Sequence, residues 1–196
     1  MKDPYHLAQR VLRRVSHGAL ATLSVEQDGW PFASAVSLVA QPDGCPAFLI
    51  SGLAEHTRNL RADPRASLLV VDPYAPTEGA PRLSLMGYAE PVTLDAMAQA
   101  RFVRLHPAAE QYLSFGDFSF WQLRPERLRL IGGFGAAGWV TGSRYCHAPA
   151  LSLADEAHLL AELGGEMANG DTLLGVDAYG VDGCDGNGQR WRDQFN

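Results

Sequence analysis

Three short apolar runs, divided by two Asp-Gly turns, constrain the fold of this chain more than any other feature. The runs span residues 18–25, 31–40 and 46–51, and the turns contain Asp28-Gly29 and Asp43-Gly44. An Asp-Gly pair between alternating apolar segments is a strong hairpin signal, because both residues tolerate the positive φ angles of a tight turn. The sequence therefore predicts a three-stranded antiparallel meander.

Further strand patterns follow at residues 66–72, 82–92 and 127–140. Helices are predicted from Asp3-Pro4 to about residue 17, between Ser51 and Pro64, and after Thr93. The connections are too short for the crossovers of a parallel sheet, and the glycines among residues 132–138 argue against one unbroken final strand. We therefore expect a mainly β fold with helices (α+β), built on a small barrel of six antiparallel strands.

The last quarter of the chain has a different pattern. Ser152 is placed to cap a helix, and an apolar run around Leu173 and Val176 leads into a Gly/Asp-rich turn and the alternating segment 189–195. We expect two domains, a barrel at residues 1–145 and a small helix-plus-hairpin α/β appendage at residues 146–196. The appendage is too small to be stable unless it docks on the barrel.

Charge and cysteine usage exclude several functional classes. The formal charge of −6, without a Lys/Arg cluster, argues against nucleic acid or an anionic membrane as partner. No run approaches the roughly 18 apolar residues of a membrane helix, and residues 1–17 contain no continuous signal-peptide core. The chain has three widely spaced cysteines, Cys45, Cys146 and Cys184. An odd number at this spacing suggests neither a disulfide framework nor a zinc site, and we expect the protein to be located in the reducing cytoplasm.

The segment after residue 49 runs from an apolar strand through Ser51-Gly52 into a short helix. Amides of Gly52, Leu53 and Ala54 at a helix N-terminus would favour an anion. The simpler alternative is that Ser51 only caps the helix and that the arginines are solvated. The side chains that would complete a phosphate cradle are Ser51, His56, Thr57 and Arg58.

Other catalytic and metal patterns are missing from the sequence. It contains no GxSxG elbow, P-loop or dinucleotide GxGxxG, which removes support for hydrolase and kinase functions. Its six histidines show no HxH or HExxH spacing, so no metal site is predicted. His147, beside Cys146, could reach an axial haem position.

Several segments together resemble the pyridoxamine 5′-phosphate oxidase-like, FMN-binding split-barrel superfamily, and within it the haem-utilisation (HugZ-type) branch. The resemblance covers about residues 5–141, and its most specific part is the run S-x-L-A-x-H-T-x-N-L followed by D-P-R-A-S-L. The segments are GALATLS, PFASAVS, FLISGLAEHTRNLRADPRASLLVVDP, RLSLMGYAEPV and FSFWQLRPERLRLIGGFGAAGWV.

The resemblance implies a split-barrel homodimer with two ligand sites at the subunit interface. The oxidase enzymes of this superfamily have basic residues at the positions of Ser34 and Val39 and a C-terminal Arg-x-His substrate motif. This chain has neither, which argues against oxidation of pyridoxine phosphate. The residues that match the FMN phosphate site are Ser34, Ser51, His56, Thr57, Arg58 and Asn59.

Haem-degrading relatives take an axial histidine from a C-terminal tail, but this chain has no histidine after His158. His147 or His17 could replace it. The resemblance also draws attention to Thr22 and Asp117, which match polar positions near the haem pocket of relatives.

Three functions remain open at this stage. The leading hypothesis is an FMN-dependent oxidoreductase of unassigned substrate, in which the flavin carries the redox chemistry. The second is a haem-binding or haem-degrading protein that uses the same interface cleft. The third is a non-catalytic module with a degenerate cleft. The sequence identifies no catalytic residue, substrate or electron donor.

Overall fold

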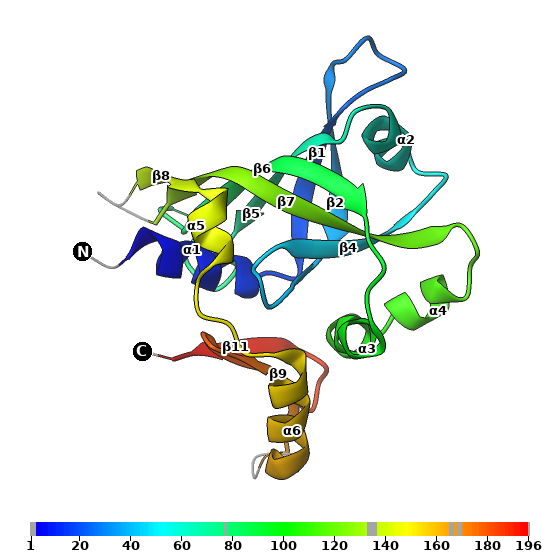
Figure 1. The fold of residues 1–196 in the computed structure, drawn as a ribbon. Coiled ribbons are helices and arrows are strands. Elements are labelled where there is room, and N and C mark those ends of the chain that lie inside the picture. Colours follow the sequence, from blue (N-terminus) through cyan, green and yellow to red (C-terminus); the bar gives the residue numbers. More distant parts are fainter. Residues whose placement is uncertain (1–2, 77, 133–136, 165–166, 168–169, 196) are drawn as a thin grey trace.

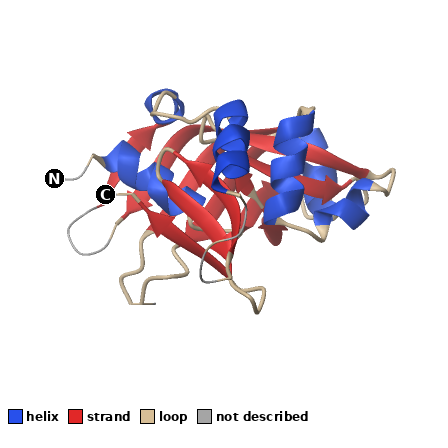
Figure 2. Ribbon diagram, turned by 90° about the horizontal axis from the view of Figure 1, so that it is seen from below, coloured by secondary structure: helices blue, strands red, loops and turns tan. Residues whose placement is uncertain are grey.

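A computed structural model describes residues 3–76, 78–132, 137–164, 167 and 170–195 (Figure 1). A large antiparallel sheet curls around the main core, and a small sheet with one helix lies beside it near the C-terminus. Helices flank the strands instead of alternating with them along a parallel sheet (Figure 2). Within these residues, no helix is both long and apolar enough to cross a membrane.

The barrel is formed by six principal strands in the spatial order β2-β1-β5-β6-β7-β4, and every neighbouring pair is antiparallel. Two short strands extend it, with β3 beside β4 and β8 beside β7. This arrangement confirms the predicted α+β split barrel of six antiparallel strands. The strands are β1 (His17–Leu23), β2 (Pro31–Ser37), β3 (Val39–Ala40), β4 (Pro46–Ser51), β5 (Arg65–Val71), β6 (Arg82–Pro91), β7 (Phe118–Ile131) and β8 (Ala137–Thr141).

The expected three-stranded meander is wrong in its third strand. β1 and β2 form a hairpin around Asp28 and Gly29, both at positive φ, but β4 pairs with β3 and β7. Phe48 on β4 faces the main core, whereas Ala47 faces a second cluster with Phe102 and Phe120. A strand with both faces covered suits a place beside the long β7 better than a place beside the half-exposed β2.

The strand pattern at residues 127–140 forms two strands instead of one, as the glycines in it indicated. β7 ends at Ile131, and β8 begins at Ala137 and pairs back on β7. The glycines at 133 and 135 lie outside the described residues.

The described residues form six helices beside the strands, and two of these helices differ from expectation at their ends. α1 ends at Arg13 instead of near residue 17, because the chain turns so that β1 can begin at His17. Asp95, not Thr93, caps α3, since its carboxylate accepts the amide of Ala98 at 2.8 Å. The helices are α1 (Pro4–Arg13), α2 (Glu55–Ala62), α3 (Ala96–Leu105), α4 (Ala109–Leu113), α5 (Gly142–Cys146) and α6 (Leu153–Leu163).

The C-terminal segment folds as α6 and a three-stranded antiparallel sheet instead of a helix and a hairpin. The apolar run around Leu173 forms the additional strand β9 (Thr172–Asp177), which pairs with β10 (Gly180–Cys184), and β11 (Arg190–Gln194) completes the sheet. This unit docks on the barrel through buried ion pairs, including Arg13 with Asp177 at 3.3 Å.

Candidate functional site

The outer face of the barrel carries small and apolar side chains where water would favour polar ones. Side chains alternate between the two faces of a strand, so every second residue of β1, β2 and β5 points outward. Leu69 and Val71 on β5 are 42% and 45% exposed, and Tyr88 on β6 is 45% exposed. Contiguous exposed apolar surface of this kind marks a site for a ligand or a partner. The outward residues on β1 and β2 are Ala19, Ala21, Leu23, Pro31, Ala33 and Ala35.

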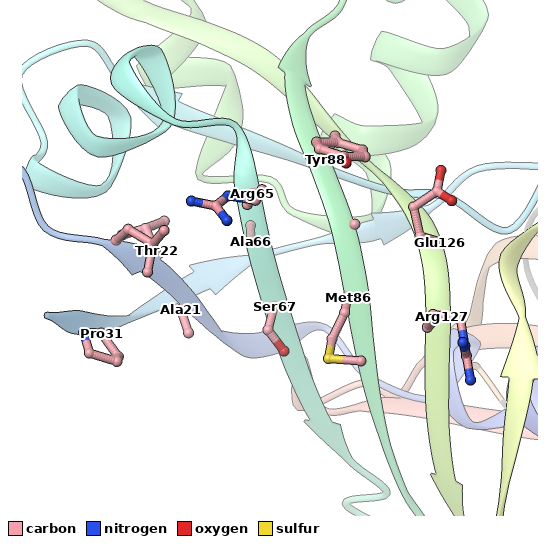
Figure 3. Close-up of a pocket in the computed structure, with 12 residues that line it drawn as sticks. Ala21, Thr22, Pro31, Arg65, Ala66, Ser67, Met86, Tyr88, Glu126 and Arg127 are labelled. Atoms are coloured by element: carbon pink, nitrogen blue, oxygen red, sulfur yellow. The ribbon is translucent and has the colours of Figure 1, made fainter. Parts of the chain in front are cut away.

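Two open grooves lie on this face, each with a volume of about 470 Å³. The first crosses β1, β5, β6 and β7, with Met86 between Ser67 and Arg127 and Tyr88 at one end (Figure 3). The second lies over β1, β2 and β5 and includes His17, Leu69 and Val71. Because Ala19 and Ala21 share one face of β1, the two grooves adjoin along the same strand.

Two arginines border the first groove, on the strands either side of β6 (Figure 3). Arg65 binds Asp63 at 2.5 Å, and hydrogen bonds from Arg65 lower the pKa of Asp63 to about 2. The guanidinium of Arg127 lies 5.4 Å from the ring centre of Trp139 on β8. Arg127 therefore places a positive charge beside the apolar surface, whereas the charge of Arg65 is paired with Asp63 and Glu126 adds a carboxylate to the same groove.

His17 lies at the start of β1 and lines the second groove. Its Nδ1 is 2.8 Å from Ser16 Oγ, and its ring meets that of His106 edge-on with centroids 5.6 Å apart. Burial lowers the pKa of His106, and His106 Nε2 lies 3.0 Å from the Leu38 carbonyl oxygen. A neutral His106 can donate this hydrogen bond only from Nε2–H, so its tautomer is fixed.

The structure brings together Ser34 and His56, two of the residues expected at the FMN phosphate site. Ser34 Oγ lies 2.9 Å from His56 Nδ1, which joins β2 to α2. Ser34 alternates with the outward-facing Ala33 and Ala35, so its side chain points to the α2 side of β2, while the residue itself also lines the second groove. Burial lowers the pKa of His56, and its buried Nε2 has no hydrogen-bond partner among the described residues.

The amides expected to bind an anion after Ser51 instead donate hydrogen bonds within the protein. α2 begins only at Glu55, and the preceding residues form a hydrogen-bonded turn. The Gly52 amide donates to the Asp117 carbonyl at 2.6 Å, and the Leu53 amide donates to Ser51 Oγ at 3.1 Å. Ser51 Oγ itself donates to the Asp117 carboxylate at 2.5 Å. A carboxylate at this position disfavours a second anion.

Three other residues expected at the FMN phosphate site have partners within the protein. Thr57 is fully buried and its hydroxyl donates to the Ser51 carbonyl at 2.6 Å. Asn59 is also fully buried, and its amide donates to Thr22 Oγ1 at 3.0 Å. Arg58 is half exposed and pairs with Glu26 at 2.7 Å. Thr57 and Asn59 thus hold α2 against the barrel, while Arg58 keeps a solvated ion pair.

His147, the other histidine considered for haem, follows α5 and is exposed. Its Nδ1 lies 2.5 Å from the Ser143 carbonyl oxygen, and it does not line either of the two grooves. Sequence reasoning did not propose the groove residues Arg65, Met86, Tyr88 and Arg127 as site residues, although Arg65 lies in the D-P-R-A-S-L run. The signal that could have found the face is the alanine at every second position of β1 and β2.

A family model described as CREG, beta-barrel matches residues 1–147. The non-canonical heme oxygenase HOZ of the chloroplast of Arabidopsis thaliana is 35% identical over 137 residues, which is 69% of this chain and 42% of that protein. The chain therefore spans less than half the length of this curated relative.

Solved structures agree with this likeness. A heme binding protein from Mycobacterium smegmatis is 30% identical with a TM-score of 0.68, over 100% of this chain and 89% of that one. A protein of the pyridoxinephosphate oxidase family from Clostridium acetobutylicum has a TM-score of 0.54 at 16% identity, over 73% of this chain and 99% of that one, which shows the fold alone. These matches confirm the resemblance to the split-barrel superfamily and to its haem-related branch.

Proposed function

Because this chain belongs to the CREG β-barrel family of split-barrel proteins, we propose that it binds haem on the outer face of the barrel. The observation that carries the proposal is the apolar face itself, on which His17 and two arginines border adjoining grooves. Haem binding is also what the name of the mycobacterial neighbour describes, and haem degradation is the activity in the name of the plant relative.

The residues of this face fit a porphyrin. A porphyrin needs a flat apolar surface, an axial nitrogen and partners for two carboxylates. The outward alanines, Leu69 and Met86 supply the surface, and His17 is the candidate axial ligand. Arg65 and Arg127 can donate to carboxylates. Haem would supply redox and oxygen chemistry, whereas the chain binds and orients it and excludes water from one of its sides.

The same apolar face is suited to contact between two copies of the chain. One subunit leaves the grooves open, and a second copy would cover the exposed Leu69, Val71 and Tyr88. An interface between identical surfaces around a two-fold axis needs only one such patch. We therefore propose that two chains associate through this face and that each ligand lies between them.

FMN is the second candidate, and the Ser34–His56 contact is the observation that favours it. The unpartnered Nε2 of His56 could donate to a phosphate oxygen. The other cradle groups argue against it, since Ser51 faces the Asp117 carboxylate and the side chains of Thr57 and Asn59 are bonded within the fold. Flavin-dependent oxidoreductase activity therefore has less support than haem binding.

Parallel absorption titrations test the proposal. Purified protein is titrated with haemin and, separately, with FMN, and the visible spectrum and the dissociation constant are recorded. Saturable binding of haemin at micromolar concentration, with FMN weaker, is the expected result. Saturable binding of FMN alone would contradict the haem proposal, and binding of neither ligand would favour the non-catalytic module.

A further inference from the structure

Two cysteines that are 101 positions apart in the sequence meet in the structure. Cys45 Sγ, at the start of β4, lies 3.7 Å from Cys146 Sγ, at the end of α5. Both thiols are free. A disulfide bond is about 2.05 Å long, so a shift of less than 2 Å would join the two sulfur atoms.

The backbone around both cysteines is held in place by buried hydrogen bonds. Tyr145, which precedes Cys146, is fully buried, and its hydroxyl donates to the Gly44 carbonyl at 3.0 Å. Gly44 precedes Cys45, so this bond links the two cysteine segments directly. Gln9 of α1 donates to the Tyr145 carbonyl at 2.9 Å. The approach of the two thiols is therefore fixed by the packing around them.

The two thiols lie in different environments, and this difference indicates which of them reacts first. Cys146 is partly exposed, whereas Cys45 is buried. The hydrogen bond from Cys45 lowers the pKa of Cys146, while the same contact, burial and nearby Asp43 raise the pKa of Cys45. The thiolate is the nucleophile in thiol chemistry, so Cys146 attacks first and Cys45 keeps its proton.

We propose that Cys45 and Cys146 are a reversible modification site, at which a hydroperoxide oxidises the two thiols to an intramolecular disulfide. The Cys146 thiolate attacks the peroxide, the O–O bond breaks, and Cys146 becomes a sulfenic acid. Cys45 sulfur then attacks the Cys146 sulfur, and the sulfenic oxygen leaves as water with the Cys45 proton. In total, two thiols and one hydrogen peroxide give one disulfide and two waters.

The disulfide would tie α5 to the turn before β4. α5 continues directly from β8, and Thr141 at the end of β8 pairs with Arg127 of the first groove. Oxidation would therefore fix the strand that borders the groove. The bond closes a loop of about 100 residues, and closing a long loop restricts the unfolded chain, so we expect Tm to rise by about 5–10 °C.

Thiol counting and peptide mass spectrometry test this inference on the full chain. The protein is exposed to a small excess of hydrogen peroxide, unfolded, alkylated and digested. Of its three cysteines, the native chain should keep one alkylated residue, Cys184, and yield one linked peptide that contains Cys45 and Cys146. Dithiothreitol should restore all three thiols.

Two variants distinguish oxidation of the Cys45–Cys146 pair from nonspecific oxidation of cysteine. Cys184 lies on β10 with its Sγ 3.6 Å from the Asp185 carbonyl oxygen, so Cys184→Ser should form the same disulfide and serves as the matched control. Cys45→Ser should give no disulfide within the chain, and dimedone should trap the sulfenic acid on Cys146.

Several outcomes would overturn the proposal. They are retention of all three thiols, a linkage that includes Cys184, or direct conversion of Cys146 to a sulfinic acid in the native chain. Absence of a dimedone adduct on Cys146 in Cys45→Ser, when the native chain is still oxidised, would overturn the assignment of Cys146 as the attacking thiol.

Discussion

Arg101 of α3 and Glu156 of α6 form a buried ion pair, with 2.9 Å between Nε and Oε2. Their side chains are 7% and 4% exposed. Glu156 Oε1 also accepts the Val176 amide of β9 at 3.1 Å and faces Arg104 at 3.4 Å. One carboxylate thus links α3, α6 and the small sheet, and it is one anchor of the C-terminal unit.

Glu156→Gln should destabilise the protein strongly, because it leaves the buried Arg101 without a counter-charge. We expect the free energy of unfolding to fall by about 3–5 kcal/mol. Glu162→Gln on the same helix is the matched control, since Glu162 is 62% exposed and its change should stay within about 0.5 kcal/mol. Urea denaturation measures both, and equal losses in the two variants would show that Glu156 is not an anchor.

Stability should fall as the pH drops below about 6.5. Burial lowers the pKa of His56 and of His106, whereas both have ordinary values near 6.5 in the unfolded chain. The unfolded state therefore binds more protons in this range, and the free energy of unfolding decreases with falling pH. Urea denaturation at about pH 7.5 and about pH 5 measures the decline.

His106→Gln should make this pH-dependent decline smaller. His158→Gln is the control, since His158 lies on α6 with 71% of its side chain exposed. A decline that is identical in His106→Gln and in the native chain would contradict the assignment to His106.

A charge on the outer face should prevent self-association. Leu69→Glu introduces a carboxylate at the centre of the proposed dimer interface, where burial without a partner is costly. Sedimentation velocity should show a dimer for the native chain and a monomer for this variant. Leu163→Glu changes a leucine that is 57% exposed on α6 and should remain a dimer. A monomeric native chain, or dimers in both variants, would refute this interface.

Gly87→Ala should destabilise the barrel at the point where the β6–β7 register shifts. A methyl group on Gly87 would lie 1.9 Å from the Arg124 carbonyl oxygen, so backbone must move. We expect a loss of about 1–3 kcal/mol. Gly138→Ala on β8 is the control, because nothing lies within 4 Å of its added methyl group. Thermal unfolding compares the two, and an unchanged Tm in Gly87→Ala would contradict the close approach.

Local patterns predicted most of the strands. β4 begins and ends where its apolar run does, and the Asp28-Gly29 hairpin follows from turn chemistry. The pairing of β4 with β7 could not be predicted in this way, because it depends on which surfaces cover the two faces of β4. The close approach of Cys45 to Cys146 was hidden for the same reason, since their contact spans 101 positions.

The candidate site was harder to predict than the fold. The motif around His56 identified residues that matter to the fold, but Thr57 and Asn59 turn inward and bond to the barrel. Spacing on a helix shows which residues share a face, not which face packs inward. The two adjoining grooves together depend on alanines from β1 and β2 and on Arg65 and Arg127, which come together only when the strands pair.

The most direct test of the proposed function is a haemin titration of His17→Ala beside His158→Ala. The native chain and His158→Ala should give the same Soret band and the same dissociation constant. His17→Ala should shift or lose the Soret band and bind haemin about tenfold more weakly or worse, because an axial nitrogen is removed. An unchanged spectrum and affinity in His17→Ala would contradict His17 as the ligand, and absence of haemin binding by the native chain would contradict the account as a whole.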